Sequence, residues 1–166
     1  MKRFLALMLT AASILSLCAC SKAPSYERPV SFYYPVSEMQ YDATGSAISP
    51  EVREGKDLTS LESTLELYLN GPQDSAYTDP FPQGLRIQDI DSIESTLYLT
   101  FSDELGKLSG MDLTVACCCI TLTCLELTNA SNIFIQAESV LLGGEKSITM
   151  NRDCLLLLDN SGEAND

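Results

Sequence analysis

The chain has neither histidine nor tryptophan, and only 10 of its 166 residues are Lys or Arg, against 23 Asp or Glu. Without histidine, a Ser-His-Asp triad, a Cys-His dyad, an HExxH zinc site and a histidine metal cage are all excluded. Nucleic-acid binding depends on Lys and Arg that neutralise phosphates, so a formal charge of −13 argues against a nucleic-acid partner. The cysteines, the acidic residues and the apolar segments remain as the informative features.

The N-terminal residues predict a lipoprotein signal peptide. Two basic residues precede the apolar stretch Phe4–Leu17, which is shorter than the ~20 residues that a membrane-spanning helix needs. The stretch ends in Leu17-Cys18-Ala19-Cys20, which resembles the bacterial lipobox: a Leu, two small residues and a Cys that is diacylated before cleavage in front of it. We therefore expect a signal peptide over residues 1–19 and lipidation of Cys20, with an uncleaved hydrophobic anchor as the alternative.

Lipidation of Cys20 would place the protein on the extracytoplasmic face of the cytoplasmic membrane. Each acyl chain contributes ~0.8 kcal/mol per buried methylene, and two chains hold a protein firmly. The acidic body would be repelled by anionic headgroups, so the lipid rather than a basic patch would be the anchor. Residues 20–29 are then the lipidated Cys and a polar, Pro-containing tether, residues 30–158 a single domain, and residues 159–166 an acidic disordered tail.

An amphipathic helix is predicted in the first half of this domain. Thr59 and Glu62 match the capping-box pattern S/T-x-x-D/E, and apolar residues then recur at helical spacing as far as Leu69. Asn70-Gly71-Pro72 ends the helix, because Gly permits a left-handed C-cap and Pro cannot continue the helix. We expect Gly71 to have a positive φ, so that a bulkier residue there would destabilise the domain.

Ser109–Leu127 is predicted to be a second helix. Ser109 and Asp112 repeat the capping-box pattern, and the segment is longer than an ordinary strand. The alternating, β-branched Ile120-Thr121-Leu122-Thr123 favours a strand instead, so the helix prediction rests mainly on length. Only Asp112 and Glu126 are charged, and we therefore expect the helix to be mostly buried.

Alternating apolar residues predict five strands, and a further strand or extended segment near the end. With the two helices, the expected order is β-β-α-β-β-α-β-(β). This order predicts an α+β domain in which both helices pack on one face of a small, mostly antiparallel sheet. The predicted strands are Val30–Tyr34, Ile48–Arg53, Leu85–Ile90, Leu97–Phe101 and Asn132–Ala137, with Ser147–Leu158 as the last segment.

The cysteines of the domain match no common metal or redox motif. Consecutive residues of a helix point ~100° apart, so Cys117, Cys118 and Cys119 cannot converge on one ion. Cys117 and Cys124 share a helix face but lie two turns apart, too far for a disulfide, and no C-x-x-C is present. We expect small buried thiols, with a reactive thiol, or a disulfide from Cys154 to the helix, as the alternatives.

No pattern of polar residues predicts an active site. The acidic pairs Asp89/Asp91, Asp103/Glu104 and Asp74/Asp79 could act as glycosidase carboxylates or bind Ca²⁺, but EF-hand spacing is absent and scattered acids are expected in so acidic a chain. A G-x-S-x-G nucleophile elbow and an S-x-x-K pair are also absent. We expect a non-enzymatic protein that needs neither a metal nor another cofactor.

Aromatic residues near the start of the domain predict an alternative, a solute- or wall-binding module. Tyr33, Tyr34 and Tyr41 could stack on sugar rings, although tyrosines in a strand also serve as core residues. A concave pocket lined by Tyr33, Tyr34 and Phe81 would favour this function. A flat apolar or charge-complementary surface would instead favour binding to another protein.

Taken together, these segments resemble the GerMN family, a domain of sporulation and spore-germination lipoproteins of Gram-positive bacteria. The most specific elements are the helix end Leu69-Asn70-Gly71-Pro72 and the loop Pro82-Gln83-Gly84. Glu94-Ser95-Thr96-Leu97 departs from the family, whose members usually have a Gly-containing turn in the middle hairpin. The other matching segments, within a resemblance that covers Val30–Ala137, are Val30–Tyr34 with Pro35, Glu51-Val52-Arg53, Leu85-Arg86-Ile87, Leu97–Ser102 and the second helix leading into Asn132–Ala137.

The resemblance implies a structural or interaction role without catalysis. The family's fold is similar to the ring-building modules of secretion-system lipoproteins, in which helices pack on a small sheet and copies pack side by side. The expected partners are therefore the membrane, through the lipid on Cys20, and either envelope proteins or further copies of this chain. The expected setting is a cell-envelope, sporulation or germination complex.

Overall fold

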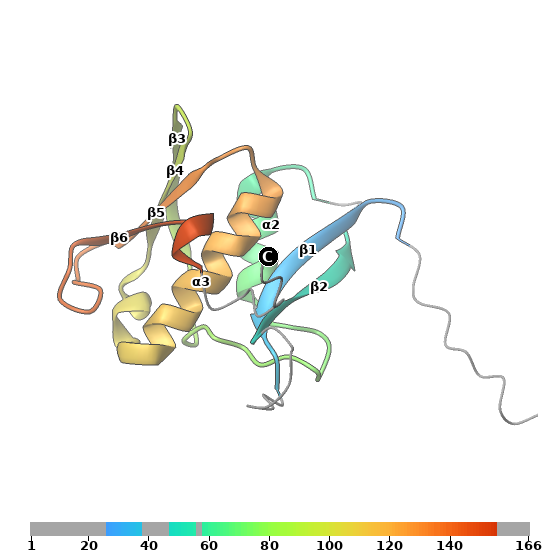
Figure 1. Ribbon diagram of the computed structural model, residues 1–166, viewed down its shortest axis with the longest axis horizontal. Coiled ribbons are helices and arrows are strands. Elements are labelled where there is room, and N and C mark those ends of the chain that lie inside the picture. The colour runs from blue at the N-terminus through green and yellow to red at the C-terminus, as the bar shows by residue number, and fades with distance from the viewer. Residues whose placement is uncertain (1–25, 38–46, 56–57, 156–166) are drawn as a thin grey trace, which may run out of the picture.

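The computed structural model describes residues 26–37, 47–55 and 58–155. Its helices and strands follow the order ββαββαββ, which confirms the α+β class and the expected order, including the last strand (Figure 1). The strands are β1 (Pro29–Pro35), β2 (Ile48–Glu54), β3 (Ile87–Ile93), β4 (Thr96–Phe101), β5 (Asn132–Ala137) and β6 (Ser147–Asn151). The helices are α2 (Leu61–Leu69) and α3 (Gly110–Leu127), with the short 3₁₀ turns η2 (Asp103–Lys107) and η3 (Arg152–Cys154).

The strands divide into two sheets, with the two helices between them. β1 and β2 form an antiparallel hairpin, and the remaining strands form a four-stranded sheet in the order β3-β4-β5-β6. In that sheet β4 and β5 are parallel and the other two pairs are antiparallel, so α3 is the crossover that a parallel pair requires. Figure 1 shows the four-stranded sheet, the helices and the hairpin as successive layers. The strands predicted to form one sheet thus cover the helices from two sides.

The larger core lies between the four-stranded sheet and the helices. It is built by alternation along β4 and β5, where every second side chain points inward and is at most 7% exposed. Burying one large apolar side chain contributes about 1.5–3 kcal/mol, so this face is a main source of stability. The inward residues are Leu97, Leu99, Phe101, Ile133, Ile135 and Ala137.

α3 is buried on nearly every side because both sheets pack on it. All residues from Ala116 to Cys124 are buried, whereas a surface helix keeps one polar face. By length and composition α3 could cross a membrane, but 56% of it is buried inside the domain. The same position explains the strand-like pattern of Ile120–Thr123, because a helix that is buried all round has no 3.6-residue period to detect.

The edge of β1 that faces away from β2 lies against the helices. The Tyr33 backbone N–H donates to Thr123 Oγ1 of α3 at 2.9 Å, and the Tyr68 hydroxyl of α2 donates to the Tyr33 carbonyl at 2.9 Å. The Tyr34 hydroxyl in turn donates to the Tyr68 carbonyl at 2.7 Å. Side chains of the helices thus replace a neighbouring strand and satisfy the buried backbone groups of β1.

The sequence predicted the C-terminal end of α2 correctly and its N-terminal cap wrongly. Gly71 has a φ of +83°, which confirms the left-handed C-cap. The predicted capping box, however, is wrong by one residue: Ser60, not Thr59, is the N-cap, and Ser63 rather than Glu62 closes the box. The Ser63 hydroxyl accepts from the Ser60 N–H, and the Ser60 hydroxyl from the Ser63 N–H. A short hydroxyl can therefore take the place of the Glu that the pattern anticipates.

Candidate functional site

Two charged side chains of β2 are buried in the middle of the hairpin layer. Glu51 and Arg53 are two residues apart, so they share one face of the strand, and they are 7% and 5% exposed. Arg53 donates from Nε to Glu51 Oε2 at 2.6 Å and also from Nη2. The guanidinium lies over the rings of Phe32 and Tyr34, 5.0 and 5.5 Å from their centroids. Paired charge and aromatic rings thus compensate for the loss of water around both groups.

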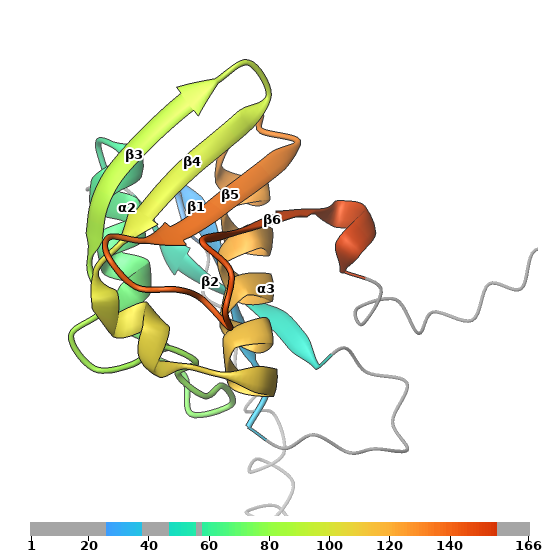
Figure 2. The same cartoon turned by 90° about the vertical axis from the view of Figure 1, so that its left-hand side faces the viewer.

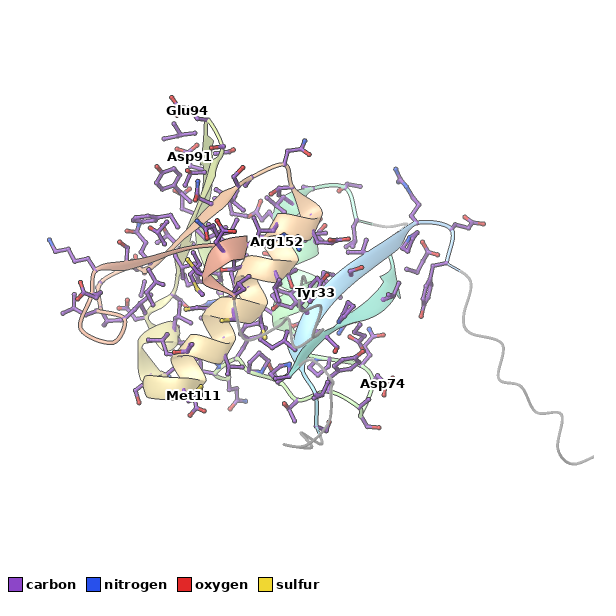
Figure 3. All side chains as sticks on the ribbon, viewed as in Figure 1. Tyr33, Asp74, Asp91, Glu94, Met111 and Arg152 are labelled. Atoms are coloured by element: carbon purple, nitrogen blue, oxygen red, sulfur yellow. The ribbon has the colours of Figure 1, made fainter. Side chains whose placement is uncertain are left out.

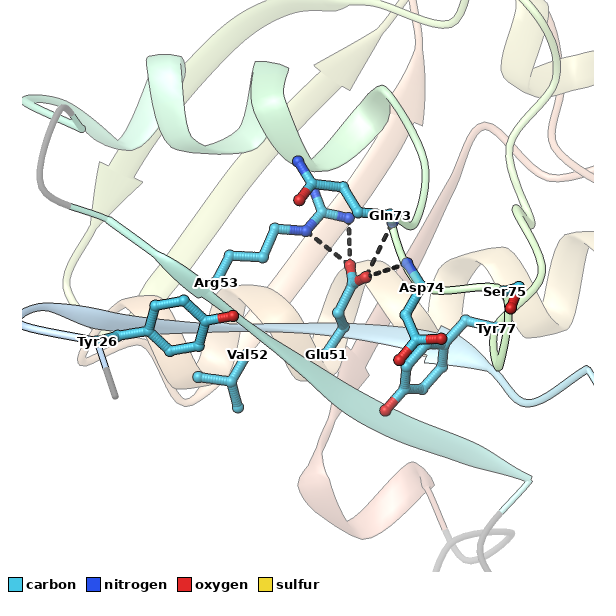
Figure 4. Close-up of a pocket in the computed structure, with 8 residues that line it drawn as sticks. All are labelled: Tyr26, Glu51, Val52, Arg53, Gln73, Asp74, Ser75 and Tyr77. Atoms are coloured by element: carbon cyan, nitrogen blue, oxygen red, sulfur yellow. Dashed lines mark hydrogen bonds and ion pairs between the residues drawn. The ribbon is translucent and has the colours of Figure 1, made fainter. Parts of the chain in front are cut away.

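The same pair fastens β2 to the segment that follows α2 (Figure 4). Glu51 Oε1 accepts from the backbone N–H groups of Gln73 at 2.9 Å and Asp74 at 2.7 Å. Arg53 Nη2 donates to the carbonyl of Gly71 at 2.7 Å. The turn after α2, with its left-handed Gly71, is therefore positioned by the charged residues of β2.

This charged pair is a structural element rather than a reactive one. Both Glu51 oxygens accept hydrogen bonds from fixed donors within the fold, and these bonds hold β2 and the turn after α2 together. An open cleft of about 570 Å³ borders the pair and is lined by Tyr26, Val52, Ser75 and Tyr77 among others. The hydrogen bonds of the pair fix a loop on the rim of this cleft.

The cysteines of α3 are buried and protonated, as expected for core thiols. Burial raises the pKa of Cys117 and of Cys124 to about 12, and it raises the pKa of Cys119 as well. A thiol is nucleophilic only as its thiolate, and the raised pKa values keep the thiolate form of these residues scarce near neutral pH. In the part of the chain that the structure describes, the five cysteines are unbonded to one another and no three His, Cys, Asp or Glu side chains cluster as metal ligands.

The pocket predicted from Tyr33, Tyr34 and Phe81 is not formed. Tyr34 is fully buried and Phe81 is 8% exposed; both pack on Tyr68, with ring centroids 5.1 and 5.0 Å away. Tyr33, the next residue along the strand, points to the opposite side and packs with a second, smaller core cluster that includes Ile48. Alternation along β1 separates the two tyrosines, so they cannot line one ligand site.

The acidic pairs weighed as candidate sites are separated or hold turns. Asp74 and Asp79 accept from the N–H groups of Ala76 and Phe81, both at 2.9 Å, which is the Asx-turn arrangement. Asp103 accepts from the Ser139 N–H at 2.7 Å and so joins η2 to the loop after β5. The Asp89/Asp91 pair is exposed on β3.

The second candidate site is the outward face of the four-stranded sheet. Figure 2 shows this sheet in front, with α2 and α3 behind it, so neither helix covers the outward face. The strand register arranges its side chains in three cross-strand rows. These rows are Ile93, Thr96, Asn132 and Asn151; Asp91, Tyr98, Phe134 and Thr149; and Asp89, Thr100, Gln136 and Ser147.

This outward face combines an aromatic centre with neutral polar groups and an acidic edge. The rings of Tyr98 and Phe134 are in contact, with centroids 5.0 Å apart, and Ile93 beside them is 54% exposed. None of the twelve side chains is Lys or Arg, and both carboxylates belong to β3. In Figure 3 Asp91 and Glu94 lie together at the tip of the β3–β4 hairpin. Aromatic rings with a polar rim are typical of protein-binding surfaces.

Comparison with protein families identifies the domain. A family model described as "Germane: Sporulation and spore germination" matches residues 31–142, which is more than half of the chain. The chain belongs to the Germane, or GerMN, family. The match includes both sheets apart from β6, and both helices, and it confirms the resemblance seen in the sequence. No curated protein matches the sequence.

Two solved structures align with most of this chain. The tandem GerMN domains of the sporulation protein GerM from Bacillus subtilis align with a TM-score of 0.55 and 15% identity, over 75% of this chain and 45% of theirs. A provisionally assigned lipoprotein from Clostridium perfringens aligns with a TM-score of 0.48 and 17% identity, over 80% of this chain and 93% of its own. The chain thus spans less than half of the GerM tandem, and at 15% identity the likeness shows the fold alone.

Some of the predicted features lie outside the described residues, and some features of the structure were not predicted. Cys20, the signal peptide over residues 1–19, Tyr41 and the tail over residues 159–166 all fall outside those ranges. The buried pair on β2 was not predicted, because nothing in the sequence distinguishes a buried Glu or Arg from an exposed one. The Tyr98–Phe134 pair follows from the predicted alternation of β4 and β5, once their parallel register is known.

Proposed function

We propose that this GerMN domain is a non-catalytic interaction module, held on the extracytoplasmic face of the cytoplasmic membrane by lipid on Cys20. The lipobox-like Leu17-Cys18-Ala19-Cys20 supports the anchor, and the family, described by its role in sporulation and spore germination, supports an envelope setting. In this proposal the domain binds a protein of an envelope, sporulation or germination complex through its exposed surface.

The observation that carries the proposal is the uncovered face of the four-stranded sheet. Most side chains of this face are polar, and the Tyr98–Phe134 pair at its centre and the exposed Ile93 at its edge supply an apolar contact for a partner. The carboxylates of Asp89 and Asp91, with no cation on the face, favour a partner whose contacting surface is basic and apolar. The net charge of −13 disfavours a second copy of this acidic chain as the occupant.

Chemical crosslinking of the membrane-bound protein tests this function. The protein would carry a tag and be crosslinked in growing and in sporulating cells of its host, and the products would be identified by mass spectrometry. We expect one envelope protein to recur as a partner, and a Cys20→Ala variant to leave the membrane fraction and lose that product.

Two other outcomes would contradict the proposal. A ladder of multiples of this chain would replace the partner by self-association. An uncrosslinked monomer in every condition, together with co-sedimentation of the purified protein with cell-wall glycan, would make wall binding the function instead.

A further inference from the structure

Two of the cysteines lie where the C-terminal turn meets α3. η3 ends at Cys154, which is exposed, and Leu155 directly after it is 4% exposed. Leu155 belongs to the same small core cluster as Cys118, Cys119 and Leu122 of α3. η3 packs against α3. The chain thus brings an exposed thiol to the side of α3 on which Cys118 lies.

Electrostatics separates Cys118 from the other cysteines of the helix. Burial raises the pKa of the Cys118 thiol, and the charge of Cys154 adds to that rise. Cys154 makes no such contribution to the pKa of Cys117, Cys119 or Cys124. Charge interactions between thiols fall off with distance. Together with the packing of Leu155 and Cys118 in one cluster, this selects Cys118 as the partner of Cys154.

Asn151 fixes the position of Cys154. Its Oδ1 accepts from the Cys154 N–H at 3.2 Å and from the Cys154 thiol at 3.2 Å. The turn is therefore capped, and the exposed sulfur is held near the helix instead of sampling all directions. Because η3 is a single three-residue turn, bond-forming contact needs an adjustment of this turn and leaves the larger core in place.

We propose that Cys118 and Cys154 form an intramolecular disulfide under oxidising conditions, which ties the C-terminal turn to α3. The oxidant is a low-molecular-weight disulfide such as oxidised glutathione. The Cys154 thiolate attacks it and releases one reduced thiol, and the Cys118 thiolate then attacks the mixed disulfide at the Cys154 sulfur and releases the second. Two protein thiols lose two protons and two electrons, and the reagent disulfide is reduced to two thiols.

The site gives the two steps different rates. Cys154 is exposed, so its sulfur is open to the reagent, whereas Cys118 is 4% exposed and its raised pKa keeps its thiolate scarce. The mixed disulfide on Cys154 forms first, and its resolution by Cys118 accelerates as pH rises.

The experiment follows the oxidation of the purified full-length chain by oxidised glutathione under native conditions. Intact-mass and non-reducing peptide analysis should show a monomer lighter by two hydrogen atoms, with the peptides of Cys118 and Cys154 joined. Cys154→Ser should abolish this product. The matched variant Cys117→Ser, which changes a buried cysteine one position away, should retain it.

A different product would overturn the proposal. If Cys154 carries only glutathione, or joins Cys154 of a second molecule, while Cys118 is fully alkylated after denaturation, the two thiols do not pair. Melting of the oxidised protein gives a second readout: the wild type should melt higher than its reduced form, and Cys154→Ser should show no such shift. An equal shift in both proteins would also overturn the pairing.

Discussion

The two sheets cover α3 by different kinds of interaction. The four-stranded sheet packs on the helix through apolar side chains, among them Leu99 and Ile135, which are fully buried. The hairpin is also held by directional polar bonds: the Tyr33 N–H donates to Thr123 Oγ1 of α3, and the buried Glu51–Arg53 pair bonds the turn after α2. Burial of apolar surface is non-directional, whereas a buried charge depends on each of its partners. The hairpin should therefore be the part of the fold that is more sensitive to a single polar substitution.

The largest expected effect comes from breaking the ion pair. Arg53→Met would leave the Glu51 carboxylate buried without its cation, and we expect a loss of about 3–5 kcal/mol in the free energy of unfolding. Urea denaturation of the purified protein measures this loss. On the sheet side, the volume-conserving Leu99→Met should cost less than about 1.5 kcal/mol. Equal losses in the two variants would remove the distinction between the two sheets.

The turn that the ion pair positions provides the next largest effect. Gly71 and Gly84 have nearly the same φ, +83° and +84°, but a Cβ on Gly71 would lie 2.8 Å from Asp79 Oδ2, whereas a Cβ on Gly84 would meet nothing within 4 Å. Gly84→Ala should therefore cost about 1 kcal/mol, from the left-handed backbone alone. Gly71→Ala should cost at least about 2 kcal/mol, because the contact adds to that strain. Thermal melting compares them; equal shifts would mean that Asp79 yields without cost.

Alkaline pH should lower the free energy of unfolding, first because the buried cysteines ionise and then because the buried tyrosines do. Burial raises the pKa of Cys117 from 9.0 to about 12, so its contribution is fully present below pH 9 and is lost as pH rises toward the folded value. The loss amounts to about 1.4 kcal/mol per pH unit for one such group. Tyr34 and Tyr68, whose pKa values burial also raises, add losses above their ordinary value of 10.0.

Denaturation at a series of pH values checks this order. Between pH 9 and pH 10, Cys117→Ala should lose less stability than the wild type, by about 1 kcal/mol. Identical pH profiles for the two proteins would mean that Cys117 titrates in the folded state as it does in the unfolded chain.

Two threonines of α3 should have effects of opposite sign. Both are fully buried, but Thr123 Oγ1 accepts from the Tyr33 N–H, whereas Thr121 Oγ1 has no partner among the described residues. Thr123→Val should destabilise the protein by about 1–2 kcal/mol, and Thr121→Val should stabilise it by about 1 kcal/mol. The midpoints of urea denaturation show whether the two variants change stability in opposite directions. Destabilisation by both would show that Thr121 also has a partner.

The comparison also explains how much of the structure could be predicted from the sequence. Alternation revealed β4 and β5 because their polar and apolar faces differ, and β5 matches its predicted bounds, Asn132–Ala137. The division into two sheets was not predictable, since strand patterns do not say which strands pair. A buried charge such as Glu51 has the same letter as an exposed one, so the hairpin's attachment was not predicted.

Local chemistry set a further limit on prediction. Gly71 was assigned correctly because a helix C-cap favours Gly for a backbone reason. Glu94 has a φ of +55° in the β3–β4 turn, and a Glu in the sequence gives no signal of that conformation. The outward face of the sheet could be predicted in part, because Tyr98 alternates with inward residues. Its pairing with Phe134 needed the parallel register.

The most direct test of the proposed function is position-specific crosslinking in living cells. A photoreactive phenylalanine would replace Tyr98 or Phe134 on the outward face, and Val52, which is 41% exposed on β2 of the hairpin, would be the control position. The account predicts that an envelope protein is crosslinked from both sheet positions and not from Val52. Crosslinking from Val52 alone, or equally from all three positions, would contradict the assignment of the outward face as the interaction surface.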